Sequence, residues 1–272
     1  MAIPDTPLSF PGVLSRMARM SETNSATESV MQEPAVGTSD LQPALPLDPE
    51  LEAMFRAKIH VGYSRTRRHP KMKPFIFGLR NNVEVFDLEK VRENIRAGEA
   101  WMKTLGERKA TILFVGSKPA VASAIEKAAS ELGMPYVANR WPGGLLTNFS
   151  ELRKRLDYFE DLKAKRAAGD LARYTKKEQL VFADELTRLE QKFGGIVSLK
   201  KIPDAMVIVD PVEEKAATSE AHATRVPSLG IANVDCNPES VTQVIPANDS
   251  STSSVGYIVE RLVAAYKAGL PA

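Results

Sequence analysis

The sequence predicts an α/β protein built around a parallel β-sheet. From residue 109 onwards, short apolar runs rich in β-branched residues alternate with longer segments of helical periodicity. The runs are continuously apolar, which is typical of strands buried on both faces. Alternating strands and helices imply right-handed crossovers and a doubly wound sheet. We therefore expect a flavodoxin-like, three-layer α/β/α fold with a five-stranded parallel sheet in the order 2-1-3-4-5.

Each predicted element comes from its own run of residues. The predicted strands cover residues 111–115, 136–138, 205–209, 230–234 and 243–245. The predicted helical segments cover residues 119–132, 148–193, 213–224 and 249–268. The second of these segments is too long for a simple crossover.

This long segment, residues 148–193, predicts two antiparallel helices that form an inserted coiled-coil hairpin with a break at residues 168–170. Capping boxes at Asn148 with Glu151 and at Thr175 with Glu178 are expected to start the two helices. The charged outer faces are expected to be solvated, and contact with a large partner is the alternative. One apolar seam is expected to join the helices, formed by Phe149, Leu152, Leu156, Phe159, Leu162, Leu180, Ala183, Leu186, Leu189 and Phe193.

The N-terminal part of the chain differs in composition from the rest. Residues 1–50 contain two basic and seven acidic side chains and show no sustained periodicity. Such a segment buries too little apolar surface to offset the entropy of ordering. We therefore expect a disordered acidic extension at residues 1–48, a domain at 49–268 and a short tail at 269–272. The acidity argues against a transit peptide, and a docking arm that orders on a partner is the alternative.

The composition excludes several classes of protein. The single cysteine, Cys236, rules out an intramolecular disulfide and a multi-cysteine metal site. No apolar run approaches the length of a membrane span, so we expect a cytoplasmic protein without a membrane partner. The net charge of +2 hides an uneven distribution, because residues 53–83 contain eight Lys and Arg and no acidic residue. This clustering of positive charge in one stretch is the first indication of function, because it is typical of a surface that binds an anionic partner.

The sequence offers little for catalysis. The turn after the first predicted strand contains Gly116 and Lys118 but neither a dinucleotide fingerprint nor a P-loop. Asp204, Asp210 and Asp235 lie at predicted strand ends, where paired carboxylates are one interpretation and turn caps the more common one. We expect no enzyme activity, no cofactor, no metal and no small-molecule substrate. A flavodoxin-like enzyme or nucleotide sensor that uses the turn after the first strand is the alternative.

The basic stretch is better suited to nucleic acid. Residues 60–82 interleave basic side chains with Tyr63, Phe75 and Phe77, which predicts an extended cationic loop that tracks a phosphate backbone. Phe75 and Phe77 are expected to pack inwards from a short strand that pairs with residues 83–86. A second loop, residues 139–148, places a cation beside an aromatic ring and is ambiguous between packing and RNA stacking.

Several motifs occur in one order along the chain: Pro-Lys-Met-Lys-Pro-Phe-Ile-Phe-Gly at 70–78, Leu-Phe-Val-Gly-Ser-Lys at 113–118, Gly-Gly-Leu-Leu-Thr-Asn at 143–148 and Ile-Pro-Ala-Asn-Asp at 245–249. Together they resemble the ribosomal protein S2 family of the bacterial-type small ribosomal subunit, over about residues 50–268. The resemblance implies a structural protein of cytoplasmic bacterial ribosomes that supports translation without catalysis. Its implied partners are 16S rRNA near the head–body junction and neighbouring small-subunit proteins, including the large flexible ribosomal protein S1.

The resemblance also assigns RNA contacts to residues in or beside its basic motifs, namely Arg65, Arg67, Arg68, His69, Lys71, Lys73, Arg80, Asn81, Arg140 and Trp141. The chain departs from the family pattern at Tyr63, where a histidine is common, and at Arg68-His69, where a Trp-Asn pair is common. The second departure favours a phosphate contact over an aromatic one. The acidic extension is a third departure.

Overall fold

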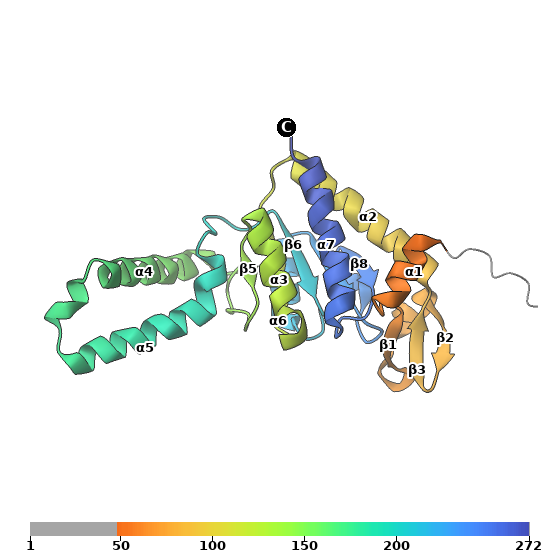
Figure 1. Cartoon of the computed structure of the whole chain (residues 1–272), viewed down its shortest axis with the longest axis horizontal. Coiled ribbons are helices and arrows are strands. Elements are labelled where there is room, and N and C mark those ends of the chain that lie inside the picture. The colour runs from red at the N-terminus through yellow and green to blue at the C-terminus, as the bar shows by residue number, and fades with distance from the viewer. Residues whose placement is uncertain (1–47, 272) are drawn as a thin grey trace, which may run out of the picture. The chain divides into compact units, whose positions relative to one another are not determined.

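A five-stranded parallel sheet lies at the centre of the structure, a computed structural model that describes residues 48–271 (Figure 1). The predicted acidic extension, apart from Asp48, lies outside the described residues. The strands are β4 (Ile112–Val115), β5 (Tyr136–Val137), β6 (Ala205–Val209), β7 (Ser228–Ala232) and β8 (Gln243–Pro246). All neighbouring pairs are parallel, and the strand order is β5-β4-β6-β7-β8, which is 2-1-3-4-5 when these strands are counted along the chain. The predicted five-stranded parallel sheet is confirmed.

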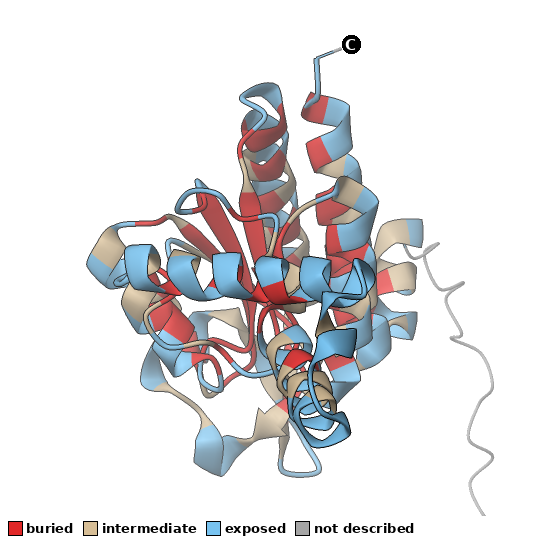
Figure 2. Cartoon of the chain, turned by 90° about the vertical axis from the view of Figure 1, so that its left-hand side faces the viewer, coloured by how far each residue is buried: buried red, intermediate tan, exposed pale blue. Residues whose placement is uncertain are grey.

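Helices cover both faces of this sheet, which explains why its strands are apolar throughout. Phe114 and Val207 pack on the side of α2 (Leu88–Glu107), α3 (Pro119–Leu132) and α7 (Thr252–Gly269). Their chain neighbours Leu113 and Met206 pack on the opposite side with α6 (Lys215–Thr224). Figure 2 shows the buried strands between these helical layers. The arrangement has the three layers that the sequence predicts.

Element boundaries differ from the prediction where polar side chains end or delay an element. Strand β7 ends at Ala232 instead of residue 234, because Asn233 turns its amide oxygen onto the N–H groups of Val234 and Tyr63. Helix α6 begins at Lys215, after a turn in which Asp210 accepts from two backbone N–H groups. Strand ends and helix starts at this edge of the sheet are therefore set by side-chain hydrogen bonds.

Two helices are missing from the sequence-based prediction. They are α1 (Pro49–Arg56), which Asp48 caps, and α2. Helix α2 has only a narrow apolar stripe among many charged residues, and it is held against α7 by a very close approach of the two backbones. A Cβ added to Gly106 of α2 would lie 2.3 Å from the carbonyl oxygen of Tyr266 in α7.

The predicted extended cationic loop is wrong, because most of residues 53–83 are folded. Strands β1 (Val61–Ser64), β2 (Ile76–Arg80) and β3 (Val83–Phe86) form an antiparallel sheet in the order β1-β3-β2. Two 3-10 turns, η1 (Arg65–Arg67) and η2 (Pro70–Phe75), connect β1 to β2. The predicted pairing of a strand with residues 83–86 is confirmed, but Phe77 is 81% exposed because the register shifts between Ile76 and Gly78.

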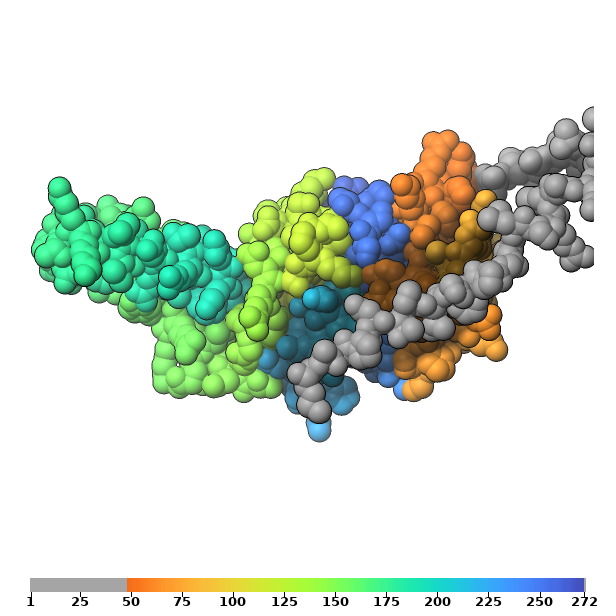
Figure 3. All heavy atoms as spheres, turned by 90° about the horizontal axis from the view of Figure 1, so that it is seen from below, coloured from red at the N-terminus to blue at the C-terminus, as the bar shows by residue number. Residues whose placement is uncertain are grey.

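Helices α4 (Phe149–Ala167) and α5 (Lys176–Phe193) project from the parallel sheet (Figure 1, Figure 3). The reciprocal capping box of Thr175 and Glu178 is confirmed, whereas Asn148 makes no side-chain cap. The predicted seam is wrong at Leu180, which is 64% exposed. Phe182 is partly buried instead, and its ring meets Tyr174 edge-on. Within residues 48–271, no helix combines the length and apolarity needed to cross a membrane.

We expect the substitution Gly106→Ala to lower the free energy of unfolding by about 2 kcal/mol or more, because the new methyl group would force α2 and α7 apart. Gly256→Ala on α7 is the matched control, since a Cβ there meets no atom within 4 Å. That control should be neutral or stabilising by about 1 kcal/mol, because alanine is the better helix former. Urea denaturation of both variants measures the difference, and equal stabilities would contradict the close-packing interpretation.

Candidate nucleic-acid interface

The residues assigned to RNA fall into two groups on the small sheet and its turns. Arg65, Lys73 and Arg80 are exposed, and none of them forms an ion pair within residues 48–271. Asn81 is also exposed and lies in the tight β2–β3 turn, where its φ is +50°. Because these side chains extend from a folded sheet and its turns, the backbone positions from which the cations reach outwards are fixed.

The second group is engaged in contacts within the protein. Arg68 forms a 2.9 Å ion pair with the buried Glu84, and Lys71 pairs with Glu239. The backbone N–H of His69 donates to the carbonyl of Val234 at 2.7 Å. These contacts hold the basic surface against the rest of the protein. The positive charges of Arg68 and Lys71 are therefore already partly balanced.

Arg67 is intermediate between the two groups. Its guanidinium lies 4.7 Å from the ring centroid of Tyr63 and 3.7 Å from a carboxylate oxygen of Asp235. The side chain is 61% exposed, so this loose pairing leaves donors free for a phosphate.

Arg140 and Trp141 lie apart from the small sheet. They follow β5, which is the opposite edge strand of the parallel sheet from β8. The loop after β8 contacts the small sheet, because the Tyr63 hydroxyl on β1 donates to Asp249. Arg140 is exposed, but Trp141 is only 8% exposed, and its indole N–H donates to Glu220 at 2.9 Å. Trp141 therefore anchors its loop instead of presenting a free ring.

Glu220 on α6 organises the loop that contains Trp141. One carboxylate oxygen accepts from the indole of Trp141 and from the N–H of Gly144, and the other accepts from the N–H groups of Leu146 and Thr147 and the hydroxyl of Thr147. Burial raises the pKa of Glu220, but these hydrogen bonds outweigh burial and hold the pKa below its ordinary value. Sequence reasoning missed Glu220, which lies more than seventy residues beyond the loop.

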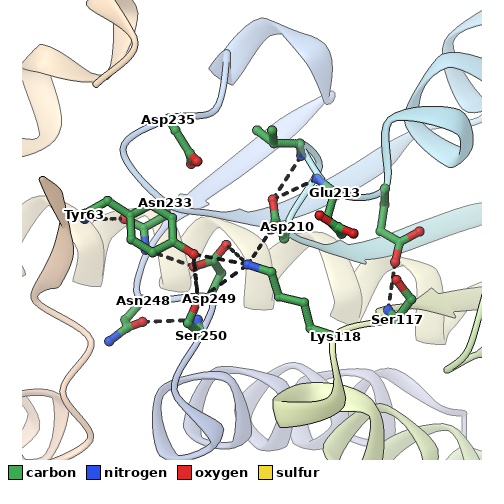
Figure 4. Close-up of polar contacts among 12 residues, drawn as sticks. Tyr63, Ser117, Lys118, Asp210, Glu213, Asn233, Asp235, Asn248, Asp249 and Ser250 are labelled. Atoms are coloured by element: carbon green, nitrogen blue, oxygen red, sulfur yellow. Dashed lines mark hydrogen bonds and ion pairs between the residues drawn. The ribbon is translucent and has the colours of Figure 1, made fainter. Parts of the chain in front are cut away.

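A buried polar cluster lies at the carboxyl ends of β4, β6 and β8 (Figure 4). Lys118 Nζ is 2.5 Å from Asp210 and 2.9 Å from Asp249, and it donates to the Tyr63 hydroxyl at 3.1 Å. That hydroxyl and Asn233 Nδ2 each donate to Asp249 at 2.9 Å. Burial alone would lower the pKa of Lys118. The ion pairs with Asp210 and Asp249 outweigh burial and hold the pKa above its ordinary value.

This cluster accounts for residues that the sequence marked as possible chemistry. Lys118 forms ion pairs with both Asp210 and Asp249, so it is not free to attract a phosphate. Asp204 accepts from the N–H of Thr111 at the amino end of the sheet and is not paired with Asp210. In the part of the chain that the structure describes, no group of His, Cys, Asp and Glu side chains is arranged to hold a metal ion.

The outer face of the small sheet and the neighbouring end of α1 carry exposed apolar side chains. Phe55, Phe77 and Leu79 are 57%, 81% and 49% exposed. The ring of Phe55 stacks on His60 with centroids 4.3 Å apart. These side chains and β3 line an apolar hollow of about 460 Å³. Sequence reasoning placed Phe77 in the core and so missed this surface.

Comparison with known proteins agrees with this architecture. The profile of the family named Ribosomal protein S2 matches residues 54–269. The "Small ribosomal subunit protein uS2" of Thermus thermophilus, found with the same match in two strains, is 35% identical over 219 residues, which cover 80% of this chain and 86% of that protein. The chain belongs to the ribosomal protein S2 family. Proteins of this family are structural and not enzymes, which confirms the expected lack of catalysis.

Two departures from the S2 family pattern acquire structural roles here. Tyr63 takes part in the buried cluster through its hydroxyl and supports Arg67 through its ring. Arg68 neutralises Glu84, which is buried inside the small sheet. The phosphate contact expected at Arg68 therefore competes with an internal ion pair.

We expect Glu220→Gln to lower the free energy of unfolding at pH 7 by about 1–3 kcal/mol, because charge-assisted hydrogen bonds are lost. The pKa of Glu220 is depressed in the folded state, so the stability due to its charge is present above the unfolded-state pKa, about 4.3. That stability is lost as the pH falls through the folded-state pKa. The difference in the free energy of unfolding between the wild type and the variant should therefore become smaller at acid pH.

Denaturation curves at pH 7 and at acid pH test this expectation. Glu213→Gln is the control, because Glu213 is exposed and its side chain accepts no hydrogen bond within residues 48–271. A gap that is the same at both pH values would show that the charge of Glu220 does not stabilise the loop.

Proposed function

We propose that the protein is a structural constituent of the small ribosomal subunit in bacteria and binds 16S rRNA near the head–body junction. Membership of the S2 family and the free cations on the small sheet support this function. Arg65, Arg67, Lys73, Arg80 and Asn81 form the proposed contact surface. The protein then acts on ribosomes in the cytoplasm and supports translation by holding RNA in place.

The observation that carries the proposal is that the small sheet and its turns present several cations that form no ion pair within residues 48–271. Arg65 lies in η1, Lys73 in η2 and Arg80 at the end of β2. The antiparallel sheet joins these elements, so the positive charges meet a folded RNA without first being ordered. Arginine adds bidentate hydrogen bonds to phosphate, whereas lysine acts as a point charge.

We further propose that the fold is flavodoxin-like and that α4 and α5 form a coiled-coil hairpin inserted into it. The strand order β5-β4-β6-β7-β8 supports the first statement. Buried Leu156 and Phe159 on α4 and Leu186 on α5 belong to one apolar cluster and support the second. The hairpin then extends the surface available to ribosomal neighbours.

The apolar outer face of the small sheet supports a protein partner in the subunit, for which we propose ribosomal protein S1. Phe55, Phe77 and Leu79 are too exposed to serve the core, and a patch of this kind marks an interaction surface. It lies on the same small sheet as the free cations, so one unit can bind RNA and a neighbouring protein.

We expect the triple variant Arg65→Glu, Lys73→Glu, Arg80→Glu to bind 16S rRNA more weakly and with a smaller salt dependence. Each lost phosphate contact removes about 0.9 from the slope of log affinity against log salt concentration, so the slope should fall by about 3. Filter binding over a range of salt concentrations, with sedimentation of small subunits, gives both measurements.

The control variant Lys103→Glu, Arg108→Glu, Lys200→Glu makes the same charge change at exposed, unpaired residues near the amino end of the sheet. Its affinity should fall less and its slope should change less. Equal losses in the two variants would mean that net charge, and not this surface, determines binding. An unchanged affinity of the first variant would refute the proposed contact surface.

We expect the double variant Phe77→Ser, Leu79→Ser to reduce the amount of ribosomal protein S1 on purified small subunits by about fivefold or more, because apolar anchors dominate such interfaces. Its affinity for 16S rRNA should be unchanged. Leu180→Ser, Val181→Ser is the control, since these apolar residues are exposed on α5. Quantitative mass spectrometry of the subunits measures the result, and normal S1 content in the first variant would contradict the assignment.

A further inference from the structure

A groove opens where α4 and α5 meet the parallel sheet. It is a hollow of about 600 Å³ between the two helices and the loop after β5. We call it the hairpin-root groove and define it by Arg140, Pro142, Arg155, Tyr158, Glu185 and Lys192, which lie along it. Its residues come from three separate parts of the chain, so only the folded protein has this surface.

The hairpin-root groove concentrates cations that lack internal partners. Arg140, Arg155 and Lys192 are exposed, and none of them forms an ion pair within residues 48–271. Several other cations of the hairpin are paired locally, for example Arg153 with Asp157 at 2.7 Å and Lys165 with Asp161 at 2.6 Å, but Arg166 and Lys177 farther along the helices form no ion pair within residues 48–271. Among the described residues that line the groove, Glu185 is the one acidic side chain. The groove is therefore complementary to an anion.

The groove also offers an aromatic surface beside these charges. Tyr158 is 46% exposed, and the buried Leu152 and Phe193 lie beneath it as an apolar floor. Nucleic-acid bases stack on such rings while nearby cations hold the phosphates. The walls are helices and a loop, so the groove has no free strand edge that would pair with the main chain of an extended peptide.

We propose that the hairpin-root groove binds an unpaired segment of RNA, with phosphates on Arg140, Arg155 and Lys192 and a base on Tyr158. This inference rests on the proposed RNA-binding function and adds a second contact to it. The small sheet that carries the first surface contacts the loop after β8 through Tyr63 and Asp249, whereas the groove adjoins the loop after β5, at the opposite edge of the parallel sheet. The protein would thus hold two RNA segments at a fixed separation.

Glu220 gives the groove its geometry. It accepts hydrogen bonds from the loop residues Trp141 and Gly144, on either side of the part of the loop that lines the groove. Arg140 is the residue immediately before Trp141 and is thereby placed opposite α4 and α5. The same carboxylate that stabilises the loop positions one wall of the RNA site.

The test uses the full chain and two hairpin variants with matched charge changes. Arg155→Glu, Lys192→Glu alters the groove, and Arg166→Glu, Lys177→Glu alters exposed cations farther along α4 and α5. Binding of 16S rRNA and of a twelve-nucleotide oligouridylate is measured by fluorescence anisotropy over a range of salt concentrations. The groove variant should lose about tenfold in affinity and about 2 from the salt slope. The control should lose less than about threefold.

A third variant, Tyr158→Ser, separates stacking from charge. Loss of a stacked base should weaken binding by about fivefold or more and leave the salt slope unchanged. Denaturation curves and the neutral variant Arg155→Gln, Lys192→Gln show whether any loss reflects misfolding. A neutral variant that is stable and binds RNA like wild type would overturn the inference.

The outcomes distinguish this inference from the proposed function. If the small-sheet variant loses affinity and the groove variant does not, the groove is not an RNA site and the proposed function stands. If neither variant loses affinity, the proposed function fails together with the inference. If the groove variant loses affinity for a polyglutamate peptide but not for RNA, the groove is a site for an acidic peptide and the inference is wrong.

Discussion

The ion pairs of Lys118 with Asp210 and Asp249 are the interaction on which the rest of the structure depends. They join the start of α3 to the ends of β6 and β8, and the Tyr63 hydroxyl connects the small sheet to the same charges. Asp249 is fully buried, so without the lysine its carboxylate would be an uncompensated buried charge. Breaking such pairs costs about 3–5 kcal/mol in other proteins. The position of the small sheet relative to the parallel sheet is therefore tied to this half-buried cation, together with the hydrogen bonds of His69 to Val234 and of Tyr63 to Asn233.

This arrangement also explains where binding does not occur. Doubly wound sheets commonly bind ligands at the carboxyl ends of their strands. Here Lys118 and its two aspartates fill that position with the protein's own charges, which form ion pairs with one another. The surfaces available to partners are displaced to the two ends of the sheet, where the small sheet and the hairpin root carry cations that form no ion pair with any residue the structure describes. A structural protein that holds large partners needs such separated surfaces more than it needs a central pocket.

The sequence predicts the parts of the fold whose burial is uniform along the chain. The strands of the parallel sheet are buried on both faces, so their continuous apolar runs are visible without tertiary information, and α3 has the predicted bounds 119–132. Helix α2 carries a usable signal, since its buried Val91, Ile95, Met102 and Leu105 recur at helical spacing, but its close contact with α7 at Gly106 is invisible in the sequence because a glycine carries no apolar signal. Phe77 was placed in the core because a register shift inside β2 is invisible to an argument from alternation.

The sequence also predicts where positive charge gathers, but not which cations are free to bind. Arg68 and Lys71 lie in the same basic run as Arg65 and Lys73, yet the first two are neutralised by Glu84 and Glu239. Glu239 is 168 residues away from its partner along the chain. The groove cations Arg140, Arg155 and Lys192 show the reverse, since they are scattered in the sequence and converge only in the fold. Local charge density therefore locates one surface and misses the other, because the availability of a cation is decided by tertiary pairing.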